Sequence, residues 1–319
     1  MRFVSLAIAI ILAGSDSLAQ GVGGCTLGTA EATLDVNDVR ANVYNHGTLF
    51  WPRPGPERYY EVPAGSGAHA FRLVTIQLGG MIGGEIRLAG TNYGPHEFWP
   101  GPLDENGRPP EDCSQYNRIY TIRKDSLLHY ERTGATTHDL LEWPADLGAP
   151  IIDGDGIAGN YSLSEGDRPA LVGDQMLWWV MNDAGGRKGW MQTAPLPIEI
   201  QMTAFAFDGI HDLPDRPSWT SLPQLREATF YRYRLVYRGN ETLEDAWFSL
   251  WADQLLYEPQ DNFIGSDSLL GLGYAYNGDD FDEAVFGDTP PAVGLDFLKG
   301  PVLLPDGLDN DSDGVVDEP

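Results

Sequence analysis

Lysine is nearly absent from this sequence, which has three lysines among its 319 residues. Basic residues as a whole are few: 20 Lys and Arg stand against 47 Asp and Glu, and the formal net charge is -27. A surface this negative repels phosphate backbones and anionic lipids. We therefore expect no nucleic-acid partner and no direct insertion of the processed chain into a membrane.

Long apolar runs are also lacking, because no segment approaches the roughly 18 apolar residues that read as a membrane helix. A short apolar run, Phe3–Ala13, follows a positively charged start, and Ser17 and Ala19 stand at the -3 and -1 positions of a signal-peptidase site. This pattern predicts a signal peptide over residues 1–19 and an exported protein. The alternative is a lipoprotein with Cys25 as its lipidated residue.

Cysteine is almost absent too, with only Cys25 and Cys113 in the chain. In an oxidising compartment two cysteines suggest one disulfide. Closing so long a loop would stabilise the fold by roughly 4 kcal/mol in the chain-entropy description. Two free, buried thiols are the alternative.

The usual catalytic motifs are missing as well. The sequence has no Gly-x-Ser-x-Gly elbow, no His-Glu-x-x-His, no Cys-x-x-Cys and no phosphate-binding loop. Its six histidines are scattered and show no zinc-type spacing. We therefore expect a protein without enzymatic activity, and a glycoside hydrolase is the leading enzymatic alternative.

What the sequence has in abundance is glycine, proline and aromatic residues, which is typical of many short strands joined by tight turns. Thr229–Asn240 alternates aromatic with arginine residues, as a strand with one packed face does, and Gln175–Met181 is a continuous apolar run that indicates a central strand. Only Arg123–Arg132 looks helical. The prediction is a mainly β protein: one large antiparallel β-sandwich-like domain over residues 20–304, followed by an acidic tail over 305–319.

The tail carries the clearest local motif, a run of alternating aspartates. Such a run followed by glycine lets carboxylates converge on one calcium ion. The expected ligands are Asp309, Asp311, Asp313 and Asp317. The acid at the last position of such a loop would lie past Pro319, so either another segment completes the site or the chain is truncated. A merely solvated acidic tail is the alternative.

A second candidate calcium loop lies within the domain, at Asp153 and Asp155, with Asn160, Glu165 and Asp167 close behind. The glycines here formally match a dinucleotide fingerprint. We reject that interpretation because two aspartates stand among the glycines, where they would repel a pyrophosphate. A purely structural turn remains the alternative to calcium.

A third candidate site combines aromatic and acidic residues between 247 and 282. Aromatic rings stack on sugar rings, and carboxylates accept hydrogen bonds from hydroxyl groups or act in glycoside cleavage. The candidate glycan-binding residues are Trp247, Trp251 and Asp253. Aromatic core residues that merely neighbour loop aspartates would give the same pattern.

An ordered series of motifs extends over nearly the whole processed chain. The motifs are Tyr60-Glu61-Val62-Pro63, Phe98-Trp99-Pro100-Gly101-Pro102-Leu103-Asp104, Trp143-Pro144-Ala145, Gly173-Asp174-Gln175, Phe230-Tyr231-Arg232-Tyr233, Tyr276-Asn277-Gly278-Asp279 and Pro290-Pro291-Ala292-Val293-Gly294. The series resembles the N-terminal region of large secreted proteins of the Bacteroidota and Rhodothermota, which usually end in a type IX secretion sorting domain. The tail resembles thrombospondin type 3 repeats.

The resemblance implies a secreted or cell-surface location in a Gram-negative bacterium and carries no established activity. Together with the acidic loops, it leads us to expect a calcium-binding β-protein with a structural, adhesive or binding role. Its partners would be polysaccharides or other cell-surface proteins. The second hypothesis is a module that binds or cleaves glycans through the residues near 247–282.

Overall fold

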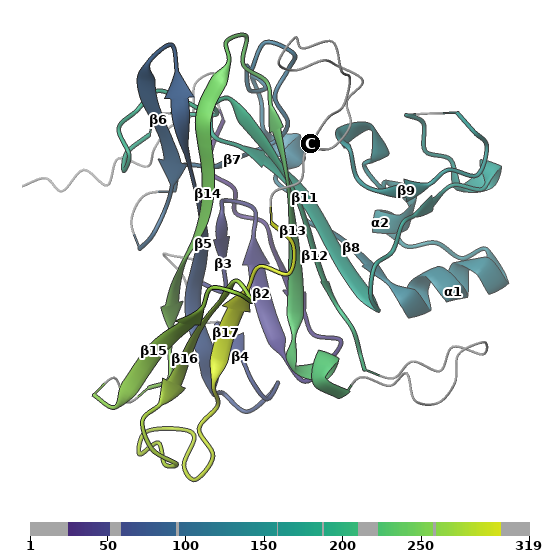
Figure 1. Ribbon diagram of the computed structural model, residues 1–319. Helices are drawn as coiled ribbons and strands as arrows, with labels where there is room; N and C mark the ends of the chain where they lie inside the picture. The colour runs from purple at the N-terminus through teal and green to yellow at the C-terminus, as the bar shows by residue number, and fades with distance from the viewer. Residues whose placement is uncertain are drawn as a thin grey trace, which may run out of the picture.

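The computed structural model of this chain describes residues 25–51, 59–93, 96–157, 159–186, 188–209, 223–257 and 260–300. Its elements are mainly strands in antiparallel sheets, so the predicted β-sandwich-like fold class is confirmed. Figure 1 shows the two large sheets side by side, with helices and loops outside one of them. The expected signal peptide (1–19) and the acidic tail (305–319), with Asp309, Asp311, Asp313 and Asp317, lie outside the described residues.

The first large sheet is built on the long strand β5 (His69–Ile82), which pairs with β14 (Leu243–Gln254) along most of its length. The register of this pair breaks once near its start, between Glu244 and Trp247, and is then regular as far as Asp253. Five shorter strands complete the sheet: β1 (Glu31–Leu34), β2 (Arg40–Tyr44), β3 (Thr48–Leu49), β4 (Tyr60–Glu61) and β6 (Glu85–Gly90).

The second large sheet has β11 (Gln175–Asn182) at its centre, between β12 on one side and two short strands on the other. Its remaining strands are β7 (Trp99–Pro100), β8 (Tyr120–Arg123), β12 (Ile198–Ala206) and, at the edge, β13 (Thr229–Tyr237). The predicted strand at Thr229–Asn240 is therefore confirmed as β13. Its Tyr233 packs against the core, whereas Arg232 and Arg234 are exposed.

Strand β11 is buried on both faces, as its unbroken apolar sequence predicted. Leu177 and Trp179 point into the core between the two sheets. Met176 and Trp178 point the other way and join a second core, which also contains Trp143 from the outer layer. A strand covered on both sides has no solvent-exposed face, so its sequence does not alternate between apolar and polar residues.

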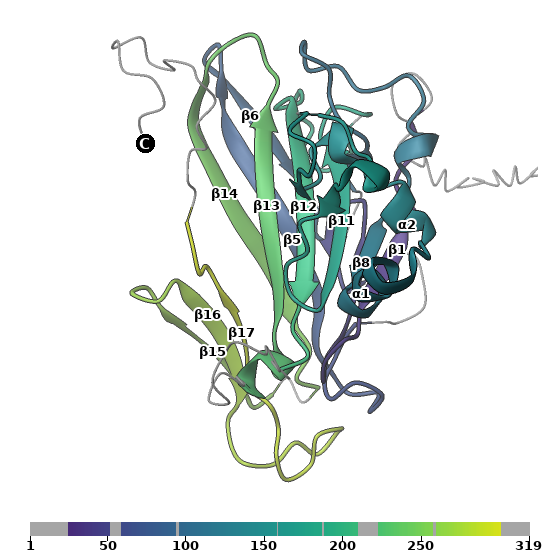
Figure 2. The same cartoon turned by 90° about the vertical axis from the view of Figure 1, so that its right-hand side faces the viewer.

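The outer layer that covers this second face contains two α-helices, α1 (Lys124–Thr133) and α2 (His138–Leu141), which lie in front of the sheet in Figure 2. Helix α1 confirms the helix predicted at Arg123–Arg132, and it ends at Gly134, whose left-handed φ of 74° suits glycine. Neither helix is long and apolar enough to cross a bilayer, a statement that covers the described residues alone. The same layer holds a two-stranded ribbon, β9 (Ile151–Ile152) and β10 (Arg168–Pro169).

A small third sheet lies at one end of the sandwich (Figure 1) and consists of β15 (Asn262–Asp267), β16 (Leu272–Asn277) and β17 (Val293–Asp296). Half of its strand residues are exposed, in contrast to those of β11 and β12, of which none is. At the start of the described chain, Cys25 and Cys113 are joined in a disulfide and lie with Trp99 in a small buried cluster.

Candidate metal site

The ribbon β9–β10 closes a loop that begins and ends with an aspartate. Ile152 pairs with Arg168, so Asp153, which follows β9, and Asp167, which precedes β10, are brought together at the mouth of the loop. The loop between them also contains the second predicted ligand, Asp155. Antiparallel pairing of its ends thus turns acids that are distant in sequence into neighbours.

Carboxylate oxygens of Asp153, Asp155 and Asp167 all lie within 4.8 Å of one another. Asp153 is exposed, Asp155 is half-buried and Asp167 is fully buried. The group contains only oxygen ligands, which are the ligands of hard divalent cations. It can therefore hold a metal ion. The structure brings together the two residues predicted from the sequence and adds Asp167 as the innermost carboxylate of the group.

Backbone amides hold these carboxylates in place. Asp167 accepts hydrogen bonds from the amides of Gly154 (2.9 Å) and Ser162 (2.7 Å), which tie the two ends of the loop together. Asp153 Oδ1 accepts from the amides of Asp155 (3.1 Å) and Gly156 (2.6 Å). The hydrogen bonds to its own acids thus shape the loop, and they orient the carboxylates before any ligand binds.

Asp155 is held by a side chain as well as by the backbone. Its Oδ2 accepts a hydrogen bond of 2.8 Å from Asn160 Nδ2, and its Oδ1 accepts one of 2.8 Å from the Ile157 amide. These bonds, the one from Asn160 foremost, lower the pKa of the Asp155 carboxyl below 3.8. Asp155 is therefore ionised, as a metal ligand must be, throughout the physiological pH range.

The amide oxygen of Asn160 is the incomplete part of this loop. Asn160 Oδ1 is shielded from solvent and has no hydrogen-bond partner among the described residues. A buried acceptor without a donor is costly, and a cation close to the three carboxylates would satisfy it. Glu165, which the sequence also placed nearby, is exposed and does not belong to the group.

Two glycines allow the loop to close tightly. A Cβ atom on Gly154 would lie 2.3 Å from the carbonyl carbon of Gly166, so the two backbones cross in direct contact. Gly166 itself has a φ of 108°, a conformation that L side chains rarely adopt. Of the glycines that formally matched a nucleotide fingerprint, Gly154 is required by this close contact, and Gly156 and Gly159 have positive φ values of 77° and 82°.

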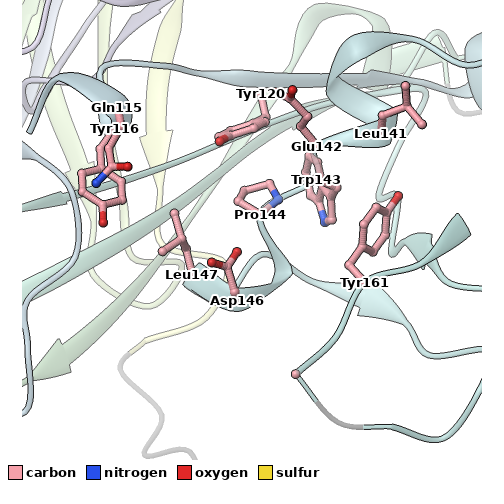
Figure 3. A pocket seen from close by; sticks show the side chains of 11 residues that line it. Gln115, Tyr116, Tyr120, Leu141, Glu142, Trp143, Pro144, Asp146, Leu147 and Tyr161 are labelled. Carbon is pink, nitrogen blue, oxygen red and sulfur yellow. The ribbon is translucent and has the colours of Figure 1, made fainter.

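An open pocket of about 460 Å³ lies beside the loop, and Figure 3 shows its lining. Gly159 and Tyr161 of the loop form one wall, and Tyr120 and Trp143 contribute aromatic rings. The pocket also holds carboxylates, and its lining is Gln115, Tyr116, Tyr120, Leu141, Glu142, Trp143, Pro144, Asp146, Leu147, Gly159 and Tyr161. Sequence reasoning missed this pocket, because its walls come from segments that only the fold brings together.

The three candidate glycan-binding residues share one face of β14. The regular register from Trp247 to Asp253 places alternate residues on the same side, away from Phe248 and Leu250, which pack on the core. The Trp247 side chain is 45% exposed and lies against Gly79, where an added Cβ would come within 2.0 Å of its Nε1. These residues are therefore on the outer surface of the first sheet.

Asp253, the acid of this set, is paired. It forms an ion pair of 3.1 Å with Arg72 and accepts a hydrogen bond of 2.5 Å from the Tyr93 hydroxyl. The Tyr93 ring in turn meets the Trp251 ring edge-on, with centroids 5.1 Å apart. Burial and the neighbouring Asp253 raise the pKa of Tyr93, so its hydroxyl stays a donor.

Comparison with known proteins identifies no relative: no protein-family model, no curated protein and no solved structure matches this chain.

Proposed function

We propose that this chain is a calcium-binding β-protein of the cell surface or the secreted fraction, with a structural, adhesive or binding role. The observation that carries the proposal is the convergence of Asp153, Asp155 and Asp167 in one closed loop. The loop supplies carboxylate and amide oxygens and no sulfur or imidazole ligand. Calcium prefers such a set and accepts irregular geometry, whereas magnesium demands a near-ideal octahedron.

The calcium ion would stabilise one wall of the adjacent pocket. Tyr161 lies between the acids of the loop in sequence, and its hydroxyl donates a 2.8 Å hydrogen bond to the Leu140 carbonyl of α2. The ring of Tyr161 packs on the second core together with Trp143. A cation that fixes the loop therefore also fixes this contact between the loop and the helical layer.

Export is part of the same proposal. The disulfide between Cys25 and Cys113 supports it, because such bonds persist in oxidising compartments and are rare in the cytosol. The shortage of lysine and the net charge of -27 fit calcium sites, and adaptation to salt would give the same composition.

Thermal unfolding of the purified chain in EDTA, in calcium and in magnesium tests calcium binding at the loop. The aspartates of the tail must first be removed as ligands, by changing Asp309, Asp311, Asp313 and Asp317 to Asn. Calcium at 100 times its dissociation constant should then add about 2.7 kcal/mol of stability by linkage. At equal ionic strength magnesium should add less.

The double variant Asp153→Asn, Asp155→Asn should lose the part of this calcium-dependent gain that comes from the loop. Asp104→Asn is the matched control, because Asp104 is an exposed acid that also accepts two backbone hydrogen bonds, from Asn106 and Arg108, and lies outside the cluster. Equal gains in all three proteins would overturn the proposal, and so would the absence of any calcium effect.

A second candidate function, glycan binding, is supported by the position of the tryptophans. Trp247 and Trp251 lie on the outer face of β14 rather than between the sheets, and Trp247 presents an exposed indole on a strand. Such a surface suits stacking on sugar rings. Because Asp253 is already paired with Arg72 and Tyr93, binding is favoured over cleavage.

Affinity electrophoresis in gels that contain single polysaccharides tests this second function. Retardation by at least one polysaccharide should be lost in Trp247→Ala. Leu128→Ala, which changes an equally exposed side chain of helix α1 (45%), should leave it unaltered. A panel of polysaccharides that retards neither the wild type nor the control would rule out glycan binding at this face.

A further inference from the structure

The region around the third sheet contains several buried polar atoms that lack partners. Asp261 Oδ1, Asn262 Oδ1 and Asp282 Oδ1 are shielded from solvent and have no hydrogen-bond partner in the part of the chain that the structure describes. Asn277 Nδ2 is in the same situation. Unsatisfied buried polar atoms are rare in folded proteins, so the three acceptor oxygens in this one small region point to a missing ligand.

Asp282 is the most informative of these residues because it is only 1% exposed. Its Oδ2 accepts two short hydrogen bonds, of 2.6 Å each, from the amides of Val285 and Phe286, and its backbone pairs with Gly287. One carboxylate oxygen is thus fully used and fixes the side chain. The other oxygen is buried and receives no hydrogen bond from any residue that the structure describes.

The partnerless residues come from two adjoining segments. Asn262, at the start of β15, is paired in register with Asn277, at the end of β16, and a Cβ on Gly278 would lie 2.5 Å from the Asp261 carbonyl oxygen. The loop after β16 carries Asp282. Its later part packs back on the segment before β15 through the Phe286 and Tyr257 rings, 5.7 Å apart.

The charge balance of this region favours a cation. Residues 255–300 contain nine acidic residues and one basic residue, Lys299. A carboxylate buried as deeply as Asp282 costs several kcal/mol unless an opposite charge accompanies it. No described arginine or lysine pairs with Asp261 or Asp282.

We propose that a second divalent-cation site, of the calcium type, lies between the start of β15 and the loop after β16, with Asp261, Asn262 and Asp282 as oxygen ligands. This site shares no residue with the Asp153 loop, so it can be tested independently of the function proposed for that loop. Its structural effect is to fasten the third sheet to the loop that follows β16. Asn277 contributes by accepting the Asp279 amide hydrogen bond of 2.9 Å, which shapes the start of that loop.

Calorimetric titration with calcium tests this site in the full chain after the other candidates are removed. The background protein carries Asn at Asp153 and Asp155 and at the four tail positions Asp309, Asp311, Asp313 and Asp317. We expect one calcium ion to bind to this background. Asp282→Asn, which keeps the shape of the side chain, should weaken binding at least about tenfold.

Two further variants make the result decisive. Asp280→Asn removes the same charge from an exposed neighbour and should leave the affinity within about twofold, and Asp261→Asn should weaken binding as Asp282→Asn does. Circular dichroism in EDTA checks that each variant is folded. No binding to the folded background would overturn the proposal, because a buried water would then fill the gap. Equal affinity in Asp282→Asn and Asp280→Asn would overturn it too.

Discussion

The two acidic regions of this protein differ in how their carboxylates are satisfied. In the Asp153 loop, amide donors hold each of the three acids, and Asp153 and Asp167 each receive two backbone hydrogen bonds. At the third sheet, Asp282 is as deeply buried as Asp167, yet one of its oxygens has no donor among the described residues. The first loop can keep its shape without an ion, whereas the second region leaves a buried charge uncompensated.

A conspicuous acidic motif and a strong need for a cation are therefore separate properties of this chain. Asp153 and Asp155 stand in a conspicuous glycine-rich run, but their carboxylates already accept hydrogen bonds from amides of the same loop. Asp261 and Asp282 are separated by a hairpin and follow no spacing rule. The cost of a buried unpaired charge, rather than the density of aspartates, identifies the second region.

Removal of the Asp167 carboxylate should have the largest effect. Asp167→Ala deletes two hydrogen bonds to a buried charged acceptor and leaves the Gly154 and Ser162 amides without partners. We expect a loss of about 2–4 kcal/mol in the free energy of unfolding, in EDTA as well as in calcium, measured by urea titration. If the loss appeared only in calcium, the internal hydrogen bonds would not be what shapes this loop.

Neutralising Asp282 in EDTA should have a smaller effect of opposite sign. Without an ion the Asp282 charge is buried and unpaired, so Asp282→Asn should stabilise the calcium-free protein by on the order of 1 kcal/mol. In saturating calcium the same change should destabilise it. Urea titrations under both conditions, with Asp280→Asn alongside, test this reversal. Destabilisation of equal size in both conditions would remove the contrast between the two regions.

The smallest expected effect concerns pH and the Asp153 loop. The pKa of Asp155 is lowered in the folded state by Asn160 and the Ile157 amide, so the stabilisation from these bonds is present above about pH 3.8. It is lost as the pH falls through the lowered folded value. Asn160→Ala should raise the pKa of Asp155 back toward 3.8, which carboxyl NMR titration can measure. An unchanged pKa would show that Asn160 does not hold this carboxylate.

Much of the fold could be predicted from the sequence, because its signals are local. The unbroken apolar run of β11, the alternation of β13 and the helix at α1 all reflect burial that is written into successive residues. The pairing of β5 with β14 could not be predicted, since it joins segments far apart in the chain. Nor could the division into two large sheets and a separate small one.

The candidate sites also combine parts that the local sequence predicts with parts that depend on the fold. Asp153 and Asp155 lie two residues apart, and their convergence follows from local turn chemistry. Asp167 is close to them only because β9 pairs with β10, and these two strands are too short to be predicted from the sequence. The shared outer face of Trp247, Trp251 and Asp253 follows from period-two alternation, but Arg72 and Tyr93 join Asp253 only through the fold.

The number of calcium ions that each chain binds is the most direct evidence for or against a calcium site in the Asp153 loop. Equilibrium dialysis with metal analysis should be run on the protein whose tail aspartates, Asp309, Asp311, Asp313 and Asp317, are changed to Asn. We predict that this protein binds calcium, and that adding Asp153→Asn and Asp155→Asn removes one ion per chain. An ion count that the two added substitutions leave unchanged would contradict a calcium site in the Asp153 loop.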